Sequence, residues 1–139
     1  MRQIKFRIWD TKTNKNVTSA LITSQNEVYY PSISAIGGIY FDRMNCDEFI
    51  CLNDNENCEG RFVLEQFAGL LDKNGREIYE GDVVCWDGPH ESEWVGAVEY
   101  IAPSFEIKWF RVPYKVGNTR LDNRVAIIGN IHENPKLLK

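Results

Sequence analysis

The sequence lacks any long apolar run, and this absence narrows its class before a motif is considered. No window approaches the ~18 consecutive apolar residues that span a membrane. The first residues alternate in character instead of forming the continuous apolar stretch of a secretory signal peptide. We therefore expect a soluble cytoplasmic protein with no membrane partner.

A large excess of charge of one sign is also missing. Sixteen basic and twenty acidic residues in 139 give a net charge of −4. This balance excludes a nucleic-acid binder that relies on overall positive charge. The hydrophobic content of 43% excludes a disordered chain. A chain of this length can bury one hydrophobic core without disulfides or metals.

Cysteine is sparse, and its spacing is not that of a metal site. Structural zinc sites usually draw on pairs of cysteines about two to four residues apart. Only Cys46 and Cys51 are that close, and Cys58 and Cys85 form no second pair. His90 and His132 are too distant from Cys46 and Cys51 in the sequence to complete a site with them. We predict unlinked thiols and neither metal nor cofactor, with a metal or redox role as the alternative.

Alternation of apolar and polar residues is the main pattern that is present. Ile4, Phe6 and Ile8 share one face of a predicted strand, so Trp9 falls on the opposite, basic face. A second strand is predicted at 26–30. The polar turn formers of segment 10–16 lie between the two strands and predict a hairpin.

Segment 42–59 is acidic, with a local charge of −5, and its asparagines predict an exposed loop over 52–60. A calcium loop is the functional alternative, because oxygen-bearing side chains alternate through 53–57. However, the glycine and the bidentate glutamate that an EF-hand loop needs are not in register. The calcium alternative therefore fails.

Glycine-containing turns organise the second half of the chain. Asn74-Gly75 predicts a two-residue turn that joins a strand ending near Leu71 to one starting near Glu77. Gly81 suits a bend between strands, and Gly96 a bend within one. Further short strands are predicted at 83–86, 93–100, 105–110 and 125–131, before a single helical turn that begins at Pro135. Together these signals indicate a mainly β protein, either a sandwich or a small barrel.

Three segments together resemble the YopX family of phage and prophage proteins: 4–10 (IKFRIWD), 66–84 (QFAGLLDKNGREIYEGDVV) and 127–138 (IIGNIHENPKLL). The resemblance is looser over 11–61 and 87–124. It implies a small Src-homology-3-like β-barrel in the C-terminal part and a setting in a bacterial host cell. It brings no catalytic residues. We therefore expect an N-terminal β-hairpin and acidic loop over 1–62 and the barrel over 63–139, in one compact unit.

No group of reactive side chains predicts an enzyme. Cys85 and His90 are near in sequence, but the cysteine falls in an apolar strand and the histidine in a loop. Glu80 and Asp82 could serve as acid and base. Their position beside Gly81 instead predicts hydrogen bonds that stabilise a turn.

Two kinds of binding surface remain. Segment 108–124 interleaves aromatic and basic residues with a local charge of +4, a pattern that suits nucleic acid. Trp9, if exposed, would mark a self-association interface. We predict a non-catalytic binding or self-assembling accessory protein, with a second copy or a host or phage protein as partner. Nucleic-acid binding through segment 108–124 is the alternative. The predicted binding residues are Trp109, Arg111, Lys115 and Arg120.

Overall fold

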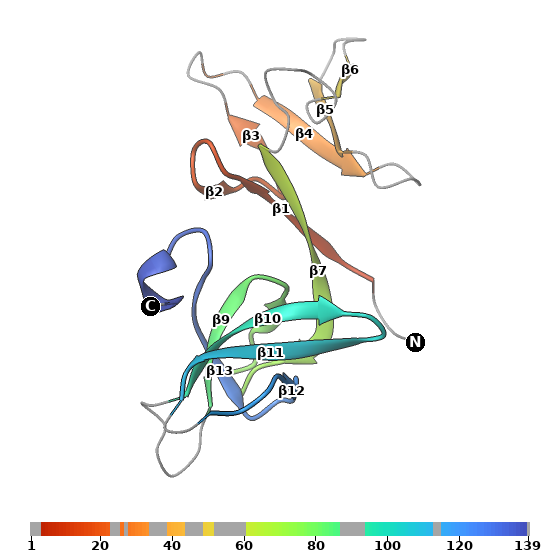
Figure 1. The fold of residues 1–139 in the computed structure, drawn as a ribbon. Coiled ribbons are helices and arrows are strands. Elements are labelled where there is room, and N and C mark those ends of the chain that lie inside the picture. Colours follow the sequence, from red (N-terminus) through yellow and green to blue (C-terminus); the bar gives the residue numbers. More distant parts are fainter. Residues whose placement is uncertain are drawn as a thin grey trace. The chain divides into compact units, whose positions relative to one another are not determined.

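A computed structural model describes residues 4–22, 26, 28–33, 39–43, 49–51, 61–86, 94–112 and 115–138. Antiparallel strands dominate these residues, so the mainly β prediction is confirmed. The described strands form three sheets, with the orders β2-β1-β7-β8, β12-β11-β10-β9-β13 and β3-β4-β5-β6 (Figure 1). The chain divides into two compact units: unit 1 comprises Met1–Lys5 and Glu65–Lys139, and unit 2 comprises Phe6–Leu64.

Unit 2 contains six short strands and the start of a seventh. They are β1 (Phe6–Asp10), β2 (Lys15–Asn16), β3 (Leu21–Ile22), β4 (Val28–Ile33), β5 (Ile39–Arg43), β6 (Phe49–Cys51) and the first residues of β7 (Phe62–Leu71). The core of unit 2 is a small apolar cluster of Ile8, Val17, Tyr29, Ile39 and Phe62. The exposed loop predicted at 52–60 lies outside the described residues.

The N-terminal hairpin forms with a different partner from the one predicted. β1 pairs with β2, so that Trp9 lies opposite Asn16, while the strand predicted at 26–30 belongs to β4 in another sheet. The predicted division into an apolar and a basic face is also wrong. Ile8, Trp9 and Asp10 are consecutive and all buried, whereas Ile4 is 73% exposed. The period-2 pattern fails because both faces of β1 are covered at its C-terminal end.

Unit 1 is built on a five-stranded antiparallel sheet. Its strands are β9 (Asp82–Trp86), β10 (Val95–Ile101), β11 (Ser104–Arg111), β12 (Thr119–Arg120) and β13 (Val125–Asn130). β10 and β11 form a long hairpin in which Tyr100 lies opposite Phe105 (Figure 1). The strands predicted from Val83 to Ile131 are therefore confirmed. The predicted helical turn is confirmed as the 3-10 helix η2 (Pro135–Leu138).

The rest of β7 pairs with β8 (Glu77–Tyr79) to complete unit 1. The strand predicted to end near Leu71 is confirmed and begins at Phe62. The hairpin between Leu71 and Glu77 is confirmed, but its turn is longer than two residues. The N–H of Gly75 donates to the Asp72 carbonyl oxygen at 3.0 Å, and Gly75 is the turn residue with a positive φ, 83°.

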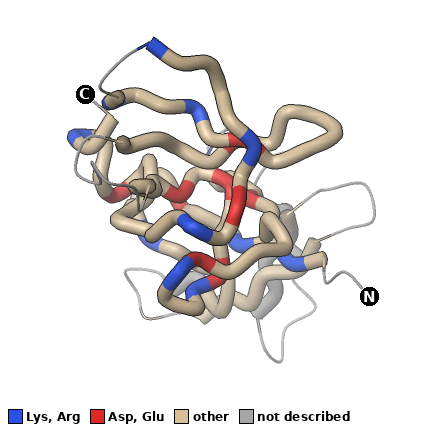
Figure 2. The backbone as a smooth tube through the Cα atoms, turned by 90° about the horizontal axis from the view of Figure 1, so that it is seen from below, with Lys and Arg blue, Asp and Glu red and all other residues tan. Residues whose placement is uncertain are grey.

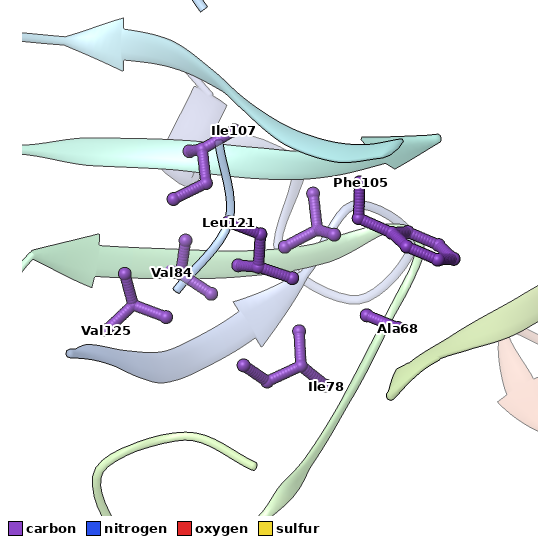
Figure 3. Close-up of a cluster of buried hydrophobic side chains, with 8 residues drawn as sticks. Ala68, Ile78, Val84, Phe105, Ile107, Leu121 and Val125 are labelled. Atoms are coloured by element: carbon purple, nitrogen blue, oxygen red, sulfur yellow. The ribbon is translucent and has the colours of Figure 1, made fainter. Parts of the chain in front are cut away.

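The core of unit 1 gathers side chains from nearly every strand of the unit (Figure 3). Phe105 and Ile107 point inward from β11, while Glu106 and Lys108 between and beside them are more exposed, as period-2 alternation requires. The buried members are Ala68, Ile78, Val84, Val98, Phe105, Ile107, Leu121 and Val125. This core fixes the strand ends that carry the candidate site.

Candidate functional site

Three tryptophans line a pocket of about 220 Å³ in unit 1, which we call the tryptophan pocket. Trp94, which is nearly buried, lies between the other two. Its ring centroid is 5.4 Å from that of Trp86 and 5.2 Å from that of Trp109, and the interplanar angles are 71° and 84°. These edge-to-face contacts are a favourable aromatic geometry. The remaining lining residues are Ile107, Thr119, Arg120, Asp122, Arg124 and Val125.

Strand register places the tryptophans together. Trp86 ends β9, and Trp94 immediately precedes β10, where the Trp86 N–H donates to its carbonyl oxygen at 3.2 Å. Trp109 lies opposite Gly96 in the β10–β11 pair. A Cβ at Gly96 would lie 3.0 Å from Trp109 Cε3, so the missing side chain leaves room for the indole. Trp109 Nε1 also donates to Thr119 Oγ1 at 2.9 Å, which fixes the plane of the ring.

The lining of the tryptophan pocket includes an ion pair between Asp122 and Arg124. The Arg124 side chain donates to Asp122 Oδ2 from two nitrogens, at 2.7 and 3.0 Å. These hydrogen bonds lower the pKa of Asp122 and raise the pKa of Arg124. The Arg124 guanidinium also lies 5.7 Å from the centroid of the Trp86 ring, within cation–π range. The negative charge of Asp122 is thus balanced by Arg124.

Arg120 also lines the tryptophan pocket and is exposed. Among the described residues it takes part in no ion pair. Glu106 on β11 is its cross-strand neighbour. Arg120 and Asp122 also line a second pocket of about 580 Å³, which we call the neighbouring pocket, together with residues 68–70, 103–105, 121 and 123. The two pockets therefore adjoin through shared residues.

The structure brings together two of the four predicted binding residues. Trp109 and Arg120 both line the tryptophan pocket, whereas Arg111 and Lys115 line neither pocket and are exposed. Sequence reasoning missed Trp86 and Trp94 as site residues. Their signal was a tryptophan at the end of the strand predicted at 83–86 and another at the start of the strand predicted at 93–100. Pairing of these two strands brings the two indoles together. Along the described backbone, basic and acidic residues are interspersed (Figure 2).

Trp9 is only 2% exposed, so the expectation of an exposed indole on β1 is wrong. Its Nε1 donates to Asn14 Oδ1 at 3.2 Å, which gives the polar edge of the ring a partner inside unit 2. The burial of Trp9 removes the observation on which its predicted interface role rested.

The other residues that were considered for catalysis have structural roles where the structure describes them. Glu80 Oε2 accepts the Gln66 N–H, and Asp82 Oδ2 accepts the Tyr79 N–H, both at 2.8 Å. The prediction of a turn-stabilising hydrogen bond is therefore confirmed for Asp82, whereas Glu80 bonds to the backbone of β7. Cys85 is a half-buried free thiol on β9. His90, Cys46, Cys58 and the segment 53–57 lie outside the described residues.

No cluster of three or more His, Cys, Asp or Glu side chains that could hold a metal ion occurs among the described residues. That part of the chain also has no helix long and apolar enough to cross a membrane.

One family model and solved structures of similar fold match the chain. The family model described as YopX protein matches residues 5–139. The chain is similar to the crystal structure of protein EF1440 from Enterococcus faecalis, with a TM-score of 0.60, 24% identity and full coverage of both chains. It is also similar to the crystal structure of protein yopX from Bacillus subtilis, with a TM-score of 0.53, 19% identity and full coverage of both. No curated protein matches the sequence.

Proposed function

Since the chain belongs to the YopX protein family, we propose that it is a non-catalytic binding protein of a phage or prophage, active in the cytoplasm of the bacterial host. Its binding site is the tryptophan pocket of unit 1. The finer fold assignment belongs to the same proposal: residues 63–139 form a Src-homology-3-like barrel that carries the site, and residues 1–62 form an N-terminal hairpin and loop region. The division of the chain near Glu65 supports this assignment.

The observation that carries the proposal is the gathering of three indoles around one open pocket. The rings of Trp86 and Trp109 are only partly buried, although large aromatic rings contribute most to stability when fully buried. Aromatic and arginine side chains are the groups that most often anchor a ligand. Here they occur together, and Arg120 is exposed beside the rings.

Three carboxylates near the candidate site and the Gly81 turn are occupied by contacts within the fold, which supports a role in binding over one in chemistry. General acid–base catalysis needs carboxyl groups that are available to a substrate. Glu80 and Asp82 instead accept backbone hydrogen bonds, and Asp122 is paired with Arg124. We accordingly propose that the chain binds its partner and performs no reaction.

A binding experiment with matched variants tests the proposal. Trp86→Leu removes one indole from the pocket, whereas Tyr100→Leu removes an exposed ring of the same unit that lines neither pocket. We expect partners retained from phage-infected host extract to be lost with Trp86→Leu and kept with Tyr100→Leu. Circular dichroism checks that both variants fold. Equal retention by both variants would place the binding site elsewhere.

The partner in this proposal can also be a second copy of the chain. The native mass of the purified protein distinguishes self-assembly from binding to a different molecule. Light scattering on the purified chain at micromolar concentration reports a homo-oligomer directly. If an oligomer forms, Trp86→Leu should weaken it and Trp9→Phe should not, because Trp9 lies inside unit 2. A strict monomer would leave binding to a different molecule as the remaining form.

A further inference from the structure

We propose that the tryptophan pocket holds one base of a single-stranded nucleic acid, whose backbone passes Arg120 toward the neighbouring pocket. This inference rests on the proposed binding function and names its ligand. The observations that carry it are the size of the pocket, its aromatic lining and the distribution of charge around it.

The size of the tryptophan pocket suits a single group of a larger ligand. Sites that enclose a whole drug-sized molecule usually measure about 300–1,000 Å³, whereas this pocket measures about 220 Å³. The neighbouring pocket of about 580 Å³ shares Arg120 and Asp122 with it. A ligand that extends from the first pocket past these two side chains reaches the second. This arrangement fits a linear polymer, with one unit inserted and the next beside it.

The lining chemistry suits a planar aromatic unit. Bases of any sequence stack on tryptophan, because every base has a π-face. Trp86 and Trp109 both stand steeply inclined to Trp94, so the three indoles offer differently oriented aromatic surfaces around one space. The neighbouring pocket adds the polar side chains of Ser104 and Asn123, which can hydrogen-bond to a sugar or phosphate.

An exposed arginine in the pocket lining offers a partner for an anionic backbone. Asp122, the acid of the lining, is already paired with Arg124. Arg120, the other basic residue of the lining, is exposed. Glu106 opposes Arg120 across the strands and offsets part of its charge. Phosphates that neutralise Lys and Arg release counterions, which contributes to affinity.

Fluorescence titration tests the inference, because three of the four tryptophans line the pocket. The probe is a single-stranded oligo(dT) of about 12 nucleotides, within the range of known single-strand sites. We expect quenching at low salt, weaker binding of the matching duplex, and an affinity that falls as salt rises. Trp86→Leu should weaken binding at least about fivefold, the lower end for one lost base stack, while Tyr100→Leu leaves it unchanged.

Arginine variants test the path of the backbone. Arg120→Ala removes an exposed cation beside both pockets, and Arg76→Ala removes an exposed cation that lines neither. Arg120→Ala should weaken binding and reduce the steepness of the salt dependence, because each phosphate contact adds about 0.7 to the log–log slope for single strands. Arg76→Ala should change neither quantity.

Three results would overturn the inference: no binding of the oligonucleotide at low salt, equal binding of the duplex, or equal effects of Arg120→Ala and Arg76→Ala. If the oligonucleotide does not bind but Trp86→Leu still abolishes retention of a protein partner, the ligand is a protein and the proposed binding function stands. If both measurements fail, the binding function fails as well.

Discussion

Gly81 and Gly75 have almost the same backbone angle but very different surroundings. Their φ values are 81° and 83°, in the left-handed region that side chains rarely adopt. A Cβ at Gly81 would lie 1.8 Å from Glu65 Oε2, while a Cβ at Gly75 would meet nothing within 4 Å. Glu65 is buried and lies 3.3 Å from His132 Nε2, so its carboxylate has little room to move away.

The two glycines therefore predict different costs for the same substitution. Gly75→Ala should lower the free energy of unfolding by about 1 kcal/mol, the cost of a left-handed alanine. Gly81→Ala should lower it by about 3 kcal/mol or more, because displacement of a buried carboxylate adds to that cost. Urea unfolding of both variants measures the difference. Equal losses would show that the contact with Glu65 does not constrain Gly81.

At the scale of elements, Gly96 affects both the packing of the β10–β11 hairpin and the tryptophan pocket, because it lies opposite Trp109. A Cβ at this position would lie 2.6 Å from Ile107 Cγ2 and 2.8 Å from the Lys108 carbonyl oxygen, so a methyl group has no space between the strands. We expect Gly96→Ala to destabilise unit 1 by about 1–3 kcal/mol, the usual cost of overpacking. We also expect the Trp109 ring to move.

Fluorescence checks the second part of this prediction. If Trp109 moves, the emission maximum of folded Gly96→Ala should shift relative to the original chain. Ala97→Gly removes a methyl group at the next position of β10 and is the control, because residue 97 faces Lys108 and not Trp109. An unchanged spectrum in Gly96→Ala would show that the ring position does not depend on this glycine.

Local signals predicted the turns and strands of unit 1 because they depend on neighbouring residues. Asn74-Gly75 located the β7–β8 hairpin, and Pro135 located the final helical turn. The length of the β7–β8 turn was predicted wrongly, since Asp72 adds hydrogen bonds that the two-residue motif does not contain: its Oδ1 accepts the N–H groups of Asn74 and Arg76. Contacts made by residues outside the motif decide such details.

The candidate site was harder to predict for the same reason. Trp109 and Arg120 were identified from one short segment, and both line the pocket. Trp86 and Trp94 were missed because their approach to Trp109 depends on the pairing of β9, β10 and β11. The exposure of Trp9 was predicted wrongly, because period-2 alternation cannot show that both faces of a strand are covered.

At the scale of the whole molecule, Asp10 in unit 2 and Asp72 in unit 1 are both buried aspartates that several donors hold in place. In unit 2, Asp10 accepts hydrogen bonds from Arg61 Nε and a terminal guanidinium nitrogen, both at 2.8 Å. In unit 1, Asp72 Oδ2 accepts the Ile127 N–H at 3.0 Å, in addition to the bonds within its own turn. Burial raises the pKa of each carboxyl, but these hydrogen bonds and the nearby arginine outweigh it, so both pKa values lie below the ordinary range.

The lowered pKa values predict how stability depends on pH. A carboxyl group whose pKa is lower in the folded state contributes stability that is complete above its unfolded pKa of about 3.9. That contribution is lost as the pH falls through the lower folded value. We therefore expect the free energy of unfolding to be level between about pH 5 and 7 and to fall below about pH 4. Urea unfolding at a series of pH values measures this, and a level profile down to pH 2 would contradict it.

Asparagine variants assign this acid sensitivity to the two units. Asp72→Asn should cost about 1–3 kcal/mol at pH 7, since it weakens charge-assisted hydrogen bonds to backbone N–H groups. Asp10→Asn should cost about 3 kcal/mol, because it also leaves the half-buried Arg61 without its carboxylate. Both deficits should shrink at acid pH, as the original aspartates are themselves protonated. A deficit that stayed constant with pH would mean that the asparagine is merely a poor fit, and that the charge of the aspartate contributes nothing to folding.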